Sequence, residues 1–178
     1  MSLKRLVPAF ILILLAGLPQ RAASEGLKLG YIDSATILSE YKPYIDAQKE
    51  LDRFWQQKQK EAEARQKEIE DLMSRYESQK LLLSEERKKK MEEEINRRKE
   101  DYDRFMKQVF DPTTGEIARK RDELSGPIFE RINSVIQKIG AEEKFDFIFD
   151  VAPMGIVYAN PKYDLTKKVI DELNKETK

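Results

Sequence analysis

The stretch that decides the fold is residues 43–79, which read PYIDAQKELDRFWQQKQKEAEARQKEIEDLMSRYESQ. It contains no glycine, and its apolar residues recur at spacings built from three and four: Leu51, Trp55, Ala62, Ile69 and Leu72. This alternation is the period of a helix that packs along another helix in a coiled coil. Polar residues such as Lys58 and Arg65 interrupt the series, so we expect a discontinuous seam.

A second apolar series with the same spacing follows, and a turn must separate the two. It comprises Met91, Ile95, Tyr102, Phe105 and Val109. Residues 80–86 lie between the series and read KLLLSEE, in which a serine followed by two acids is typical of a helix N-cap. Antiparallel helices that fold back near residue 82 or 83 would place Ala62 opposite Tyr102 and Ile69 opposite Ile95. We therefore predict a helical hairpin arm over residues 43–126, with its tip near residues 80–84.

Residues 111–115, which read DPTTG, interrupt the second helix because proline lacks an N–H and clashes with the preceding turn. Helical spacing resumes at Ile117 and continues to Ile139, after which Gly140 is suited to end the helix. Pro127 is expected to kink this segment or to begin a new helix, and so to mark the end of the arm.

Short strand-like segments flank the arm. Leu27 to Ile32 read as a strand, and residues 145–151 alternate Phe and Val with other residues, the pattern of a strand with one buried face. Residues 155–159, GIVYA, are expected to form a further strand, and Asp164 to cap a final helix. We predict an α+β fold in which residues 25–42 and 127–178 form a small β body.

The size of this body indicates assembly. About 70 residues outside the arm are near the limit at which a single core is self-sufficient. A three-stranded sheet would also leave its edges open for pairing with another chain. We therefore expect an obligate oligomer in which several copies join their sheets.

Composition excludes several kinds of function. The 178 residues include 33 basic and 33 acidic side chains and neither cysteine nor histidine. Disulfides, thiolate or imidazole metal sites and Ser-His-Asp catalysis are therefore impossible, and we expect no cofactor and no enzymatic activity. The balanced charge also argues against nucleic acid as a partner, because such binding needs a basic excess.

Residues 1–24 are expected to be a cleavable signal peptide. Lys4 and Arg5 precede an apolar run over residues 6–18, and Ala22 and Ser24 supply the small residues found before a cleavage site. A membrane anchor is the alternative, but a span needs about 20 apolar residues. Removal of this segment would leave 30 basic and 33 acidic residues, so the mature chain would be slightly acidic.

The candidate binding residues cluster around the predicted tip. Two packed helices cannot bury three consecutive leucines, so Leu81, Leu82 and Leu83 are either a contact surface or a local cluster with Met91 and Tyr76. Residues 87–90, RKKK, are either a basic patch or a solvated face paired with the three following glutamates. The methionines and aromatic residues are either adaptable contacts, as Met73 would be, or the hairpin seam.

The chain resembles the Skp/OmpH family of periplasmic chaperones. The resemblance rests on residues 27–33 (LKLGYID), the charged hairpin, Gly126-Pro127-Ile128, the FDFIFD segment at 145–150, Tyr158 and Asp164-Leu165-Thr166. It implies a homotrimer whose shared β body carries three helical arms around a cavity. It also implies a holdase that keeps unfolded outer-membrane β-barrel proteins from aggregating in the periplasm without ATP.

The sequence departs from the best-known members in two respects, its slightly acidic charge and the break at residues 111–115. The alternative hypothesis is a structural coiled-coil spacer or adaptor of the cell envelope, which would bind one folded partner. Peripheral contact with membrane or lipopolysaccharide is also considered. The expected client-binding residues are Met73, Tyr76, Leu81, Leu82, Leu83, Lys88 and Met91.

Overall fold

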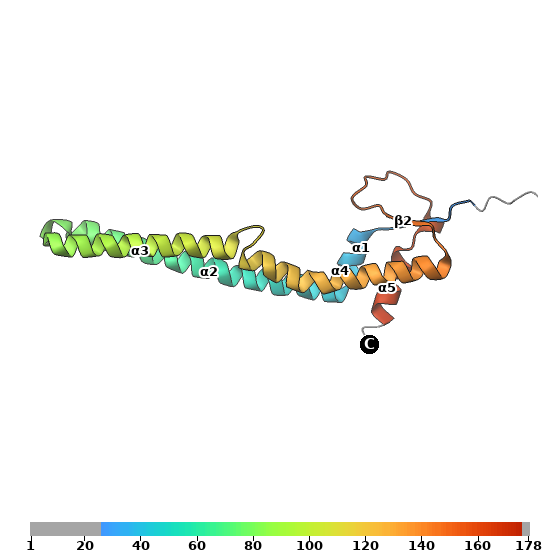
Figure 1. The fold of residues 1–178 in the computed structure, drawn as a ribbon, viewed down its shortest axis with the longest axis horizontal. Coiled ribbons are helices and arrows are strands. Elements are labelled where there is room, and N and C mark those ends of the chain that lie inside the picture. Colours follow the sequence, from blue (N-terminus) through green and yellow to red (C-terminus); the bar gives the residue numbers. More distant parts are fainter. Residues whose placement is uncertain (1–25, 176–178) are drawn as a thin grey trace, which may run out of the picture.

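The computed structural model describes residues 26–175 and shows a long arm that projects from a small body (Figure 1). The expected signal peptide lies outside the described residues. The elements are β1 Leu29–Ile32, α1 Ser34–Glu40, α2 Lys42–Gln79, the 3-10 turn η1 Lys80–Leu82, α3 Glu85–Phe110, α4 Glu116–Glu143, β2 Phe147–Asp150, η2 Pro161–Tyr163 and α5 Thr166–Lys175. The predicted α+β class, a small β body with a long antiparallel helical hairpin, is confirmed.

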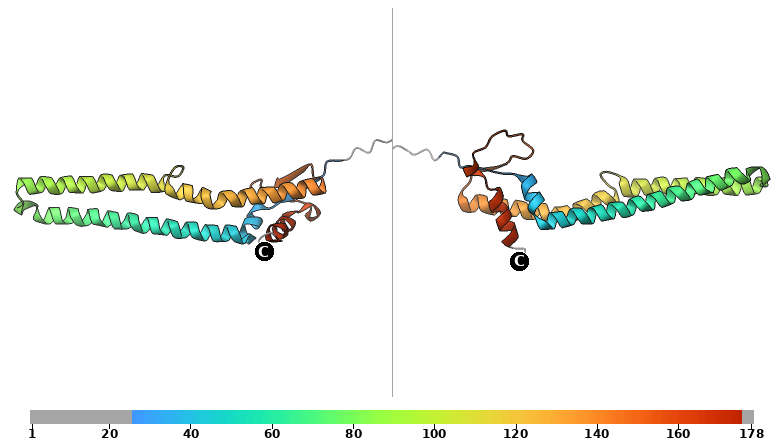
Figure 2. Two further views of the ribbon diagram at one scale, coloured as in Figure 1. Left: turned by 60° about the horizontal axis from the view of Figure 1, so that its bottom comes forward. Right: turned by 180° about the vertical axis from the view of Figure 1, so that it is seen from behind.

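The arm consists of α2 running outward and of α3 and part of α4 running back (Figures 1 and 2). With its 38 residues, α2 is about 57 Å long at 1.5 Å per residue. Its buried residues are few and widely spaced: Ala47, Ala62, Ile69 and Tyr76. Polar contacts supplement this thin seam, as where Arg98 of α3 pairs with Glu68 of α2 at 3.1 Å. Ala62 packs in one cluster with Phe105 and Val109, against which the expected neighbour Tyr102 is also packed.

The break between α3 and α4 is a tight, hydrogen-bonded turn. The N–H groups of Thr113 and Thr114 donate to the Asp111 carboxylate at 2.9 and 2.7 Å, and these bonds hold the pKa of Asp111 below its usual value. After the turn, Glu116 pairs with Lys58 of α2 at 2.6 Å. The returning half of the hairpin, which continues as α4, is thereby attached to α2 again immediately after the break.

The expectation that a new helix begins at Pro127 is wrong, and so is the expectation that the helix ends at Gly140. The helix runs without interruption through Pro127, because its packing against α2 and α5 outweighs the lost hydrogen bond and the steric clash of an interior proline. A kink at this proline stays a prediction. It ends beyond Gly140, at Glu143, and the next residue, Lys144, caps it in the left-handed conformation with φ of 57°. The N–H of Phe145 then donates to the Gly140 carbonyl at 2.9 Å, which closes the helix end. The domain division at residues 126 and 127 stays a prediction.

The described sheet differs from the expected three strands. It has two parallel strands, with Leu29 opposite Phe147 and Ile32 opposite Asp150, and a single bridge joins Tyr31 to Asp164. Residues 155–159 form no strand and are largely exposed at the surface of the body. The expectation of one buried phenylalanine face is also wrong, since Phe147 and Phe149 are exposed while Ile148 packs against the core.

The body is held together by one apolar core. Residues from β1, α1, α4 and α5 meet there, and the least exposed are Ile37, Val135, Val169 and Leu173. Asp33 caps α1 by accepting the N–H groups of Ala35 and Thr36 at 3.0 and 3.2 Å. The core therefore joins the first and last described helices of the chain through α4.

An ion-pair cluster on α5 makes stability depend on pH. Lys138 of α4 and Lys175 donate to the Glu172 carboxylate at 2.6 and 3.0 Å, and these hydrogen bonds lower the pKa of Glu172 to about 2. Because the carboxylate titrates near pH 4.3 in an unfolded chain, its stabilising contribution is present above that pH and is lost as the pH falls toward 2.

We therefore expect the free energy of unfolding of Glu172→Gln to fall less steeply with decreasing pH, between about pH 4.3 and pH 2, than that of the unaltered chain. The measurement is the free energy of unfolding in urea at several pH values between the two pKa values, at one protein concentration. Glu63→Gln, at an exposed position of α2, is the control and is expected to leave the slope unchanged. Equal slopes for Glu172→Gln and the unaltered chain would contradict this assignment.

Candidate functional site

The tip surface, defined as Met73, Tyr76, Leu81, Leu82, Leu83, Lys88 and Met91, surrounds the turn of the hairpin. After η1, Leu83 is extended and the Ser84 side chain accepts the N–H of Arg87 at 3.4 Å, which starts α3. Leu81 is 96% exposed and Leu82 is 89% exposed, whereas Leu83 is half-buried. A local cluster that buries all three leucines is thus absent, and two of them face solvent at the far end of the arm.

Tyr76 supports this surface from within. Its ring is buried and its hydroxyl donates to the Glu92 carboxylate, which raises the pKa of Tyr76 to about 12. The Lys80 ammonium lies 5.3 Å from the centre of the ring. Tyr76 therefore joins α2 to α3 below the leucines and is not itself an open contact residue.

A depression lies on the surface of the arm beside Tyr76. Met73, which is 41% exposed, lines a depression of about 340 Å³ together with Tyr76 and Ile95. Met91 is half-buried. Among the predicted residues, Leu81 and Leu82 are thus exposed at the end of the arm. Met73 is only partly exposed and lies closer to the body.

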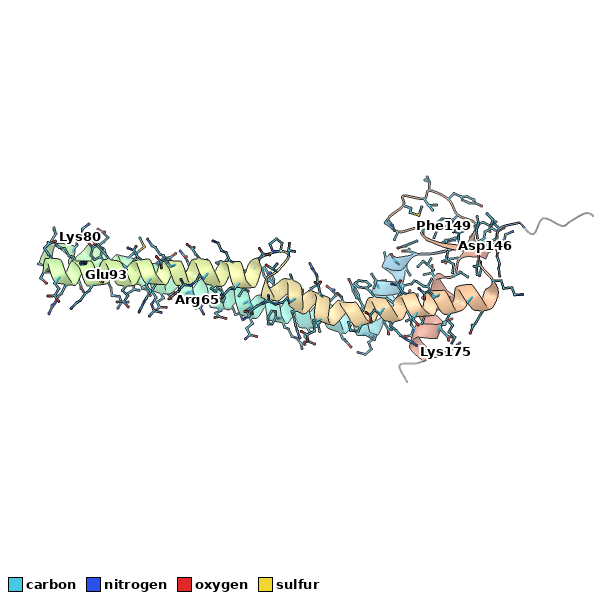
Figure 3. All side chains as sticks on the ribbon, in the orientation of Figure 1. Arg65, Lys80, Glu93, Asp146, Phe149 and Lys175 are labelled. Atoms are coloured by element: carbon cyan, nitrogen blue, oxygen red, sulfur yellow. The ribbon has the colours of Figure 1, made fainter. Side chains whose placement is uncertain are left out.

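The basic cluster near the tip is compensated by acids. Lys88 pairs with Glu85 at 2.6 Å and Lys90 with Glu86 at 2.7 Å, each one turn toward the helix start, while Lys89 lies 4.0 Å from Glu93. Figure 3 places two charged side chains, Lys80 and Glu93, at this end of the arm, far from Phe149 of the body. These pairs favour the interpretation of a solvated helix face over that of a basic patch.

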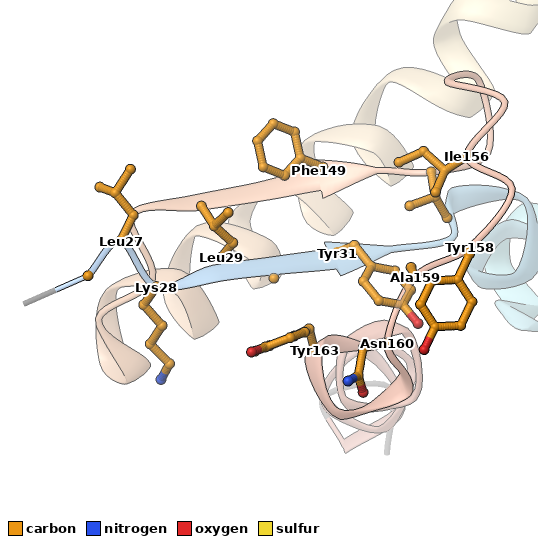
Figure 4. Close-up of a pocket in the computed structure, with 13 residues that line it drawn as sticks. Leu27, Lys28, Leu29, Tyr31, Phe149, Ile156, Tyr158, Ala159, Asn160 and Tyr163 are labelled. Carbon is orange, nitrogen blue, oxygen red and sulfur yellow. The ribbon is translucent and has the colours of Figure 1, made fainter.

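A second apolar surface, which we term the body groove, was not identified from the sequence. Leu27, Leu29, Tyr31, Phe149, Val151, Ile156, Tyr158 and Tyr163 line it, together with neighbouring residues, around a volume of about 660 Å³. Figure 4 shows that its side chains come from β1 and the residues just before it, from β2, and from the segment that follows β2. Phe149 is 40% exposed and Tyr158 82% exposed, so one copy of the chain leaves much of this surface open.

The alternating phenylalanines were the signal that could have revealed the groove. They predicted a buried apolar face, whereas Phe147 and Phe149 are exposed in the structure of one chain. The expected strand at residues 155–159 is instead an exposed segment whose Val157 is fully accessible. Apolar alternation indicates that a face will be covered, and does not indicate which chain covers it.

A metal-binding cluster and a membrane-spanning helix are both absent from the described residues. Within residues 26–175, no group of three or more acidic side chains is placed to hold a metal ion. None of the helices in the same range is long and apolar enough to cross a membrane. The arrangement of the described part suits surface contacts, which the exposed leucines and the body groove both provide.

Known proteins resemble this chain over most of its length. The profile of the family described as outer membrane protein (OmpH-like) matches residues 28–173. An uncharacterized protein of Aquifex aeolicus (strain VF5) is 27% identical over 165 residues, which cover 93% of this chain and 94% of that protein.

The same fold occurs in a crystal structure from Caulobacter crescentus CB15, described as that of a candidate outer membrane chaperone (OmpH-like). It superposes with a TM-score of 0.71 at 13% identity, over 84% of this chain and 85% of that one. At this identity the likeness shows the fold alone, whereas the profile match spans nearly all of the described residues. The chain therefore belongs to the OmpH-like family.

Proposed function

We propose that this protein is a periplasmic holdase chaperone. It assembles as a homotrimer, binds unfolded outer-membrane β-barrel proteins between its helical arms without ATP, and prevents their aggregation. The observation that carries this proposal is the pair of leucines, 96% and 89% exposed, at the end of an arm about 57 Å long. Membership of the OmpH-like family supports it.

The contacts at the tip suit reversible holding. Full burial of one leucine side chain contributes about 1.5–3 kcal/mol, which corresponds to a millimolar or weaker interaction. Several arms that engage one unfolded chain raise the overall affinity through effective concentration. Each contact still breaks readily, so the client's own folding can release it without an external energy source.

The body groove supports assembly. Leu29, Phe149 and Ile156 are 42%, 40% and 44% exposed in one copy, and their exposure to water is unfavourable. Packing of these surfaces around a three-fold axis would cover them and place three arms side by side. The exposed segment after β2 would then find the backbone partners that a single chain lacks.

Native mass spectrometry tests the proposal most directly. We expect the mature protein to appear as a trimer, and to take up one client chain when a urea-unfolded outer-membrane barrel is diluted into it. A protein that ignores the unfolded barrel would overturn the holdase function. Binding of one folded envelope protein instead would support the spacer or adaptor hypothesis.

The tip makes a specific prediction. Leu81→Ser combined with Leu82→Ser is expected to weaken capture of the unfolded barrel about tenfold or more, because two exposed apolar contacts are lost from every arm. The readout is suppression of barrel aggregation as a function of chaperone concentration.

Two controls accompany this variant. Native mass spectrometry should show an unchanged oligomer, since these leucines lie far from the body groove. Ser78→Ala, at an exposed position of the last turn of α2, should leave capture unchanged. Full capture by the double variant would remove the tip from the binding surface.

A further inference from the structure

Methionine supplies all the sulfur of this chain, because cysteine is absent. Among the methionines of the described residues, Met73 and Met154 are 41% and 56% exposed, whereas Met91 and Met106 are half-buried. A thioether is oxidised where it is accessible, and the reaction turns an apolar side chain into a polar one. An oxidant of sulfur that reaches the protein therefore meets Met73 and Met154 first.

The two exposed methionines lie at opposite ends of the molecule. Met154 belongs to the segment after β2, in the body. Met73 belongs to the tip surface and lines the depression of about 340 Å³ on the arm. Because the arm projects away from the body (Figures 1 and 2), assembly through the body groove leaves the sulfur of Met73 accessible.

The depression can hold an oxidised methionine. Asn96 and Lys99 line it together with Met73, and the side chains of both carry N–H groups that can donate to a sulfoxide oxygen. Met106 has a different setting, since it packs against the buried cluster that contains Phe105. An oxygen on Met106 would place a polar group in the seam between the helices, whereas an oxygen on Met73 changes only the surface.

We propose that Met73 is a redox-sensitive contact of the tip surface: oxidation of its sulfur by a hydroperoxide lowers the affinity for unfolded clients, and reduction of the sulfoxide restores it. The sulfur donates an electron pair to one peroxide oxygen, so that an S–O bond forms and the O–O bond breaks. The proton of the transferred oxygen moves to the departing oxygen, and hydrogen peroxide leaves as water. The sulfur is thereby oxidised by two electrons.

The change in polarity is what would weaken the contact. An apolar thioether adapts to varied side chains, whereas a sulfoxide must lose its hydration when a client covers it. The periplasm, in which we place the protein, is an oxidising compartment. The effect on clients rests on the proposed function, but the position of the oxidised residue does not.

The first part of the test locates the reaction. The mature Met154→Leu protein is treated with hydrogen peroxide, and peptide mass spectrometry follows the sulfoxide content of each methionine. Leucine has a similar volume, so this substitution removes the other exposed thioether with little change in packing. We expect Met73 to be oxidised before Met91 and Met106. Oxidation of either half-buried methionine as fast as Met73 would overturn the assignment.

The second part measures capture by the same samples, as suppression of the aggregation of an unfolded outer-membrane barrel. The chaperone concentration for half-suppression should rise about threefold or more once Met73 is oxidised, because 41% of this side chain is available for contact. Treatment with methionine sulfoxide reductases should return it to the starting value. Unchanged capture at full conversion of Met73 would overturn the proposal.

Variants of Met73 serve as controls in the same Met154→Leu background. Met73→Leu keeps an apolar contact that cannot be oxidised, so its capture should be equal before and after peroxide. Met73→Gln introduces a polar side chain and should weaken capture without peroxide. Circular dichroism should show equal helix content in both, which separates a change of surface from a loss of the arm. Peroxide-sensitive capture by Met73→Leu would assign the effect to another residue.

The experiment also distinguishes this inference from the proposed function. If the untreated protein suppresses aggregation and conversion of Met73 changes nothing, the holdase stands and the redox proposal fails. If Met73 is oxidised first but neither form captures the unfolded barrel, the site of oxidation stands and the holdase function fails.

Discussion

Leu173→Ala is expected to lower the free energy of unfolding by about 2–5 kcal/mol, the range for a large apolar side chain deleted from a core. Leu173 is 1% exposed and lies in the cluster that joins α5 to α4 and α1. Truncation removes its transfer free energy and also leaves a cavity, because the surrounding helices relax only in part. Urea unfolding followed by circular dichroism at one protein concentration measures the change.

Leu82→Ala is the matched control. The chemical change is the same, but Leu82 is 89% exposed at the end of the arm. We expect its free energy of unfolding to change by no more than about 0.5 kcal/mol. Equal losses for the two variants would contradict the burial that the structure assigns to α5.

Gly115→Ala is expected to destabilise the protein by about 1–3 kcal/mol, through steric overlap in the turn between α3 and α4. A Cβ at this position would lie 2.5 Å from the Asp111 carbonyl oxygen and 2.6 Å from that of Val109. Both atoms belong to the backbone, so neither can rotate away as a side chain could. The φ of Gly115 is −68°, and the penalty is therefore steric and not one of backbone conformation.

Gly126→Ala gives the opposite expectation. Nothing lies within 4 Å of a Cβ at Gly126, which is inside α4, so alanine there should raise stability by about 0.5–1 kcal/mol through its higher helix propensity. Thermal unfolding of both variants, compared with the unaltered chain, tests the pair. A Gly115→Ala protein as stable as the parent would show that the turn opens at little cost.

The arm could be predicted because its determinants are local. The apolar spacing of α2, the Ser84 cap and the proline at residue 112 each act within a few residues, and the helices end close to where these features place them. The candidate tip residues were found for the same reason, since three consecutive leucines cannot all lie on one helix face. Their separation into exposed Leu82 and buried Tyr76 depended on the register of the two helices.

Gly140 and Pro127 show where local rules failed. Each marks a position at which an isolated helix would end or bend, yet α4 continues through both. Contacts with α2 near the arm and with α5 in the body hold the helix on either side of Pro127. Tertiary packing outweighed the local preference that these two residues express.

By itself the sequence determined the helical hairpin, its turn and its break, because hydrophobic period and helix capping operate over one or two turns. Only the tertiary structure decided how distant segments meet: β1 pairs in parallel with β2, more than a hundred residues away, and residues 155–159 find no partner strand. The body groove was hidden for the same reason. It combines side chains from separate elements, and their proximity depends on long-range packing that no local pattern encodes.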